Sequence, residues 1–84
     1  PRVRSAMLAL LRHRAPESTI CPSDAARVAG GPHWRSRMDI ARSVAFELQR
    51  EGVVEVRQAG MPVAQGGYSG GPLRIARGRA WPAL

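Results

Sequence analysis

The hydrophobic period of this sequence changes at Gly52, and that change constrains the fold more than any other feature. Before it, residues 34–51 place apolar side chains every three or four positions, as one face of a helix does. After it, residues 53–58 alternate between apolar and polar side chains, which is typical of a strand. The fold is therefore expected to be α+β, with helices first and strands afterwards.

Two shorter helices are predicted before the long one. Residues 3–14 carry an apolar stripe at helical spacing, and the helix should end near Pro16 because proline discourages its continuation. Residues 22–29 form the second, since Pro22 suits a first helical position that needs no N–H donor. Cys21 precedes it and is expected to be a structural helix cap.

A second alternating run, residues 72–77, follows a glycine-rich stretch at 59–71 that is expected to be a flexible loop. Three helices followed by two such strands predict a winged helix-turn-helix, in which a two-stranded β-hairpin forms the wing. One domain should span residues 1–84, because the chain is too short for a second core, and residues 78–84 are expected to be a loosely ordered tail.

Several segments, in order along the chain, also resemble a known family. They are Thr19-Ile20-Cys21-Pro22-Ser23-Asp24-Ala25-Ala26-Arg27, Trp34-Arg35 with Met38, Arg42-Ser43-Val44-Ala45, Gly60-Met61-Pro62-Val63 and Gly71-Pro72-Leu73-Arg74. Together they are similar to the small bacterial proteins grouped as domain-of-unknown-function family 3253. The resemblance implies a winged-helix fold and no assigned activity. The interval 64–70 departs from the family, which usually has an acidic residue after the Pro-Val pair and a basic one before the Gly-Pro.

The charge distribution favours an acidic partner. The net charge is +7, and residues 1–16 and 56–84 each carry four arginines and no acid. An uncompensated basic surface is typical of a phosphate binder, so duplex DNA is the expected partner, and an acidic protein is the alternative. A single cysteine permits no internal disulfide, which favours a cytoplasmic location, and no apolar run is long enough to cross a membrane.

The predicted nucleic-acid contacts lie on the long helix and on the wing. In helix-turn-helix proteins the second helix of the motif enters the major groove, which points to the polar side chains near the start of 34–51. The competing interpretation is an ordinary solvated face on which Asp39 pairs with its arginine neighbours, and a plain solvent-facing ribbon for the wing. The candidate residues are Arg35, Ser36, Arg42, Ser43, Arg57, Arg74 and Arg77.

No catalytic role, cofactor or metal is expected. Cys21, His13 and His33 are scattered without ligand or nucleophile–base spacing, and the glycines do not form a phosphate-binding loop. Two other functions stay open: a protein-interaction module with Phe46 and Trp81 as anchors, or an accessory piece of an enzyme complex. A monomer is the default expectation, and a homodimer is not excluded.

Overall fold

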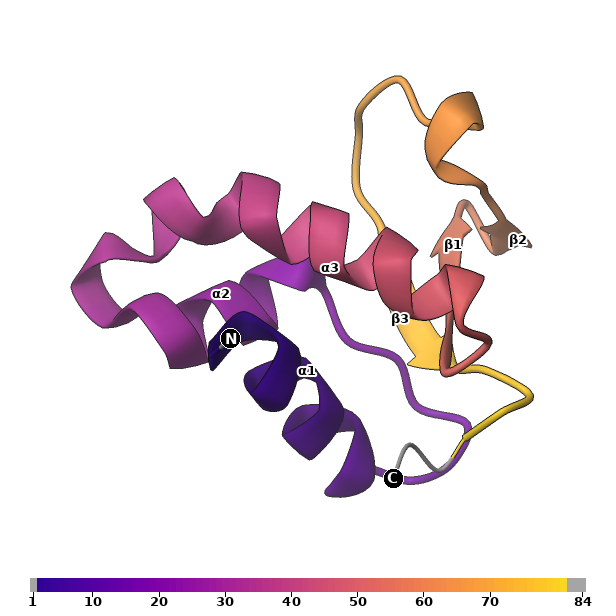
Figure 1. The fold of residues 1–84 in the computed structure, drawn as a ribbon, viewed down its shortest axis with the longest axis horizontal. Helices are drawn as coiled ribbons and strands as arrows, with labels where there is room; N and C mark the ends of the chain where they lie inside the picture. The colour runs from indigo at the N-terminus through magenta and orange to yellow at the C-terminus, as the bar shows by residue number, and fades with distance from the viewer. Residues whose placement is uncertain (1, 82–84) are drawn as a thin grey trace.

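The computed structural model describes residues 2–81, which form three α-helices and one antiparallel sheet (Figure 1). The α+β class expected from the sequence is confirmed. None of the helices in this part of the chain is long and apolar enough to span a membrane. The elements are α1 (Arg2–Arg12), α2 (Pro22–Gly30), η1 (Gly31–Arg37), α3 (Met38–Arg50), β1 (Val54–Gln58), β2 (Met61–Pro62), η2 (Gln65–Gly67) and β3 (Arg74–Arg77).

The long helix begins later than predicted. Residues Gly31–Arg37 form a 3₁₀-helix, η1, and the α-helical part starts only at Met38. The sequence Gly30-Gly31-Pro32 ends α2, and Gly31 adopts φ 54°, a backbone conformation that glycine adopts at little steric cost. His33 also departs from helical geometry, with φ −103° and ψ 22°. Residues 34–37 therefore lie in the turn before α3 and not on it.

The sheet has three strands where two were predicted. Its order is β2-β1-β3, so β1 pairs on both sides, and Ile20 adds an isolated bridge to Ile75 of β3. The additional strand arises because Ala59 and Gly60 both have positive φ, 52° and 80°, and turn the chain within two residues. The glycine-rich segment is thus a tight turn, a short strand and the 3₁₀-helix η2, and not a plain flexible loop.

The core lies where the helices meet the inner face of the sheet. The largest fully buried side chains come from every layer: Met7, Leu11, Ile20, Leu48, Val54, Val56 and Ile75. Residues 78–81 were expected to be loosely ordered, but Gly78 donates to the carbonyl of Val53 and Ala80 to that of Gly52, each at 2.9 Å. These bonds attach the start of the predicted tail to the turn after α3, and residues 82–84 of that tail lie outside the described residues.

Candidate nucleic-acid interface

Two arginines share one aromatic ring at the turn before α3. The guanidinium carbon of Arg27 lies 4.3 Å from the centroid of the Trp34 ring, and that of Arg35 lies 4.5 Å from it. Both arginines are exposed, and within residues 2–81 neither forms a salt bridge. We call Arg27, Trp34 and Arg35 the turn cluster. It holds two positive charges at the surface in positions that the indole helps to fix.

The fold positions the turn cluster by packing η1 back against α2. A methyl group at Gly30 would stand 2.9 Å from Cγ of Arg37 and 3.6 Å from Cβ of Trp34, so a side chain here would force the Arg37 side chain to shift. Arg27 is on the last turns of α2, and Trp34 and Arg35 are on η1. In Figure 1 this turn forms the end of the molecule farthest from the sheet. The cluster therefore lies directly before the N-terminus of α3.

The first turns of α3 carry balanced charges. Asp39 accepts a hydrogen bond from Arg42 at 2.9 Å, and its side chain is 97% exposed. Ser43 is exposed, whereas the hydroxyl of Ser36 donates to the carbonyl of His33 at 2.8 Å. The pairing of Asp39 with Arg42, one of the two interpretations left open by the sequence, is the one observed. Of the four predicted residues in this region, Arg35 is the arginine without a carboxylate partner among the described residues.

Two of the arginines that were predicted to lie on a wing have partners within the chain. Arg57 contacts its neighbour Glu55, with 2.6 Å between Nε and Oε1. Arg74 donates to the hydroxyl and the carbonyl of Thr19 and to the sulfur of Cys21, each at 2.8 Å. These bonds tie β3 to the segment before α2, and they occupy most of the Arg74 guanidinium. The sheet therefore presents less free positive charge than the sequence suggested.

The third arginine of this predicted set, Arg77 on β3, reaches the end of α1. Its Nη2 atom donates to the carbonyls of Leu11, Arg12 and Arg14 at 2.8, 3.4 and 3.0 Å. The last carbonyls of a helix have no partner within the helix, so a guanidinium placed there completes its C-terminus. Arg77 is thus a structural cap, a role that the sequence did not indicate.

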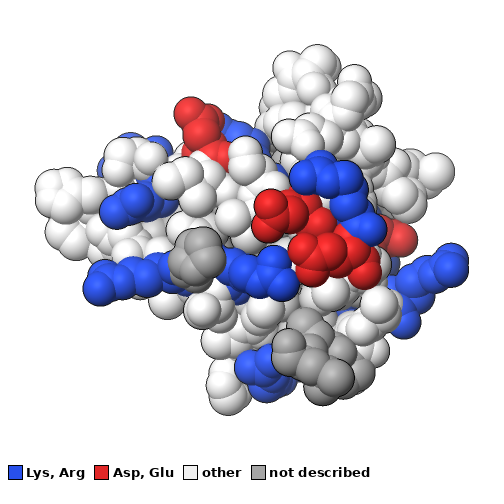
Figure 2. Space-filling model, viewed as in Figure 1, with Lys and Arg blue, Asp and Glu red and all other residues white. Residues whose placement is uncertain are grey.

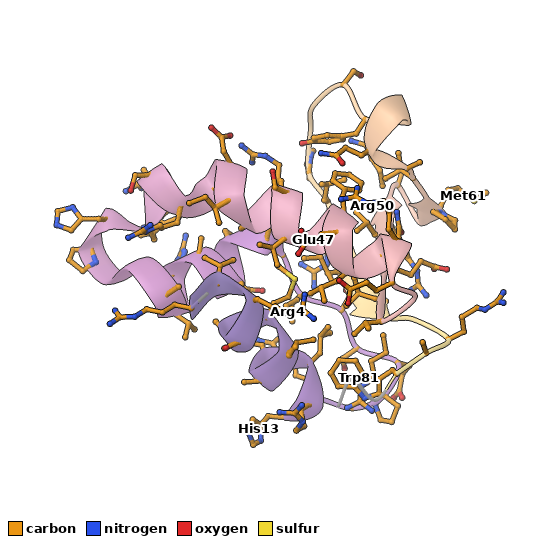
Figure 3. The ribbon with its side chains drawn as sticks, in the orientation of Figure 1. Arg4, His13, Glu47, Arg50, Met61 and Trp81 are labelled. Carbon is orange, nitrogen blue, oxygen red and sulfur yellow. The ribbon has the colours of Figure 1, made fainter. Side chains whose placement is uncertain are left out.

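The acid-free N-terminal segment does not produce a purely basic surface. Arg4 on α1 lies 3.6 Å from Glu47 and 3.3 Å from Glu51, and Figure 3 shows Arg4 and Glu47 pointing toward one another. Figure 2 shows the result on this face, where acidic side chains lie between basic ones. Arg50, also on α3, donates to Gln65 of η2 at 2.9 Å. The basic residues of the two chain ends are therefore distributed over several surfaces.

The two aromatic anchors proposed for a protein-interaction module have other roles. Phe46 is only 2% exposed and packs against Tyr68, with ring centroids 5.8 Å apart. Trp81 is half-buried against the core, and the guanidinium carbon of Arg77 lies 5.0 Å from its ring centroid. Phe46 is not available to a partner. No group of three or more potential metal ligands occurs in the part of the chain that the structure describes.

The turn cluster was not predicted because the period of residues 34–51 placed Trp34 on the inward arc of a regular helix.

A family model described as protein of unknown function (DUF3253) matches residues 1–78. The chain belongs to the DUF3253 family. The resemblance drawn from the sequence motifs is thereby confirmed. A search of curated proteins finds no match to this DUF3253 chain.

Proposed function

We propose that this DUF3253 chain is a winged-helix module that binds duplex DNA, with the turn cluster as its principal phosphate contact. In this interpretation α2 and α3 form the helix-turn-helix, η1 is its turn, and β1 to β3 form the wing. The observation that carries the proposal is the pair of exposed guanidinium groups, Arg27 and Arg35, held over Trp34 with no carboxylate partner among residues 2–81.

The chemistry of the cluster suits a phosphate backbone. A guanidinium group presents a planar fork of donors that matches two phosphate oxygens, and stacking on an aromatic ring reduces the conformational freedom lost on binding. Arg35 of the cluster lies within a few residues of the start of α3, so the cluster stands at the turn of the proposed helix-turn-helix. The net charge of +7 steers such a surface toward DNA from a distance.

The same geometry favours weak sequence selectivity. Base reading from the major groove would use the exposed face of α3, but Arg42 there is paired with Asp39. The exposed Asp39 carboxylate also repels phosphate. Binding should therefore come mainly from backbone contacts at the turn cluster, and its affinity should depend steeply on salt and little on sequence.

A salt titration with a fluorescein-labelled random duplex tests this. Affinity should fall linearly with the logarithm of salt concentration, and replacing both Arg27 and Arg35 by alanine should lower the slope by about 2 and weaken all sequences similarly. The matched control replaces Arg12 and Arg79, which are exposed elsewhere and carry the same charge. Absence of duplex binding at low salt, or equal loss in the control, would reject the proposal.

A further inference from the structure

A second surface of the molecule combines exposed apolar side chains with positive charge. Two adjoining hollows between α1 and α2 share Arg2 and Ala29, so they form one furrow, which we call the α1–α2 groove. It continues to the start of α3. Its lining includes Arg2, Ala9, Val28, Ala29, Arg37 and Ile40.

The groove exposes more apolar surface than the fold requires. Val28 is 63% exposed and Ile40 is 41% exposed, and they are two of the three large exposed hydrophobic residues in the described part of the chain. Val28 is exposed because α2 turns Ala25 and Ala26, and not Val28, toward the core. The α1 wall is low, since small side chains such as Ala9 form it. Adjacent exposed apolar residues in a furrow are typical of a contact surface for another protein.

The charge of the groove selects the partner. Arg2 and Arg37 line it, and no Asp or Glu is among its lining residues. The N-terminus of α1 lies at this end, at Arg2, so its dipole adds positive potential. The first turn of α1 has no acidic residue to offset it.

We propose that the α1–α2 groove binds an amphipathic helix of a partner protein, with apolar side chains on its inner face and Asp or Glu along its flanks. A helix fits a furrow between two helices, where its apolar side chains would cover Val28 and Ile40. Its carboxylates would then face Arg2 and Arg37. This binding is separate from the contact with DNA, since it uses none of the turn cluster.

Other occupants fit less well. A second copy joined groove to groove would bring Arg2 and Arg37 against the same arginines across the two-fold axis, which is repulsive. A DNA backbone has no apolar surface to cover Val28, which is the most exposed apolar side chain of the groove. The acidic helix satisfies the charge and the apolar area together.

Two labelled helical peptides test the proposal. Both carry the same leucine stripe, and its flanks are glutamate in one and lysine in the other. The glutamate peptide should bind the full chain and shift the amide NMR signals of Arg2, Ala29 and Ile40. Val28→Gln and Arg2→Glu should each weaken binding about tenfold, because one removes apolar burial and the other reverses a charge. Arg79→Glu, an exposed charge reversal outside the groove, is the control.

Four results would overturn the proposal. The first two are equal binding of the lysine peptide and signal shifts outside the groove. The third is a dimer in sedimentation experiments that the Val28→Gln substitution dissociates. The fourth is binding of the protein to phosphatidylglycerol vesicles in preference to the glutamate peptide. Far-UV circular dichroism should show Val28→Gln and Arg2→Glu folded, because both side chains are exposed. Val28→Gln should leave duplex affinity unchanged, so failure of this proposal is distinguishable from failure of the DNA proposal.

Discussion

Nη2 of Arg77 donates a hydrogen bond to the carbonyl oxygen of Leu11 at 2.8 Å, which joins the last strand to the end of the first helix. The two residues are 66 positions apart in the sequence. The same nitrogen also approaches the carbonyls of Arg12 and Arg14, while Nε of Arg77 is buried without a partner. A single side chain thus completes α1 and holds β3 against it.

Replacing Arg77 by methionine should therefore destabilise the fold. Methionine keeps an unbranched apolar stem but leaves the end of α1 without its donor, and a hydrogen bond involving a charged group contributes about 1.5–3 kcal/mol. Urea unfolding of Arg77→Met should show this loss. Arg79→Met, at a nearby exposed arginine, should change stability by less than about 0.5 kcal/mol. Similar losses in the two variants would contradict the capping role.

The ring of Trp34 should matter for DNA binding beyond its contribution to stability. Trp34→Ala removes the surface on which Arg27 and Arg35 rest, whereas Trp34→Phe keeps an aromatic face with a weaker cation–π attraction. We expect duplex affinity to decrease from wild type to phenylalanine to alanine, with the salt slope nearly constant because both arginines are retained. Fluorescence anisotropy at matched fractions of folded protein measures this. Unchanged duplex affinity in Trp34→Ala would show that the ring does not contribute to DNA binding.

Gln49 joins α3 to the sheet through both ends of its amide. Its Oε1 accepts from the backbone N–H of Val56 at 2.5 Å, and its Nε2 donates to the carbonyl of Val63 at 2.8 Å. Gln49→Leu leaves both backbone groups unpaired, and each unsatisfied buried group costs about 1–3 kcal/mol. Gln58→Leu is the matched control, since Gln58 makes one exposed bond, to Gly70. Chemical denaturation should show a clearly larger loss for Gln49→Leu.

The helices and the main strands could be predicted from the sequence because they depend on local patterns. The period change at Gly52 and the first helical position of Pro22 are both readable within one turn of chain. The partners of the arginines were not readable, because they come from distant segments: Arg74 binds Thr19, and Arg4 contacts Glu51. A charge count gives the number of guanidinium groups, but the tertiary fold decides which of them meet a carboxylate or a carbonyl.

η1 and β2 escaped prediction for a related reason. An apolar period of 3.6 continued through Trp34, so it gave no sign that Gly31 and Pro32 would keep residues 31–37 in a tighter helix. β2 is only Met61–Pro62, too short to show alternation, and it depends on the turn at Ala59. The turn cluster follows from η1, and so it was missed with it.

The backbone at Ala59 is strained, so a suitable substitution there should raise the stability of the protein. Ala59 has φ 52°, and a side chain with a Cβ pays about 1–2 kcal/mol in that region, whereas asparagine tolerates it through local hydrogen bonds. With Gly60 following, Ala59→Asn would create Asn-Gly, the preferred pair for a two-residue turn. We expect a rise in thermal midpoint. Ala64→Asn, at extended backbone with φ −88°, should give none.

Gly78 should tolerate no side chain, because the end of β3 passes directly over the turn that follows α3. A Cβ at this position would clash with the carbonyl oxygen of Gly52 and approach the N–H of Val54 at 2.9 Å, and neither backbone atom can move without breaking the sheet edge. Gly78→Ala should therefore cost about 1–3 kcal/mol, and the thermal midpoint should fall by about 4–8 °C for each kcal/mol. Gly66→Ala is the matched control, since its Cβ would meet no atom within 4 Å. If the two variants have the same thermal midpoint, the close approach between Gly78 and Gly52 does not constrain this end of the sheet.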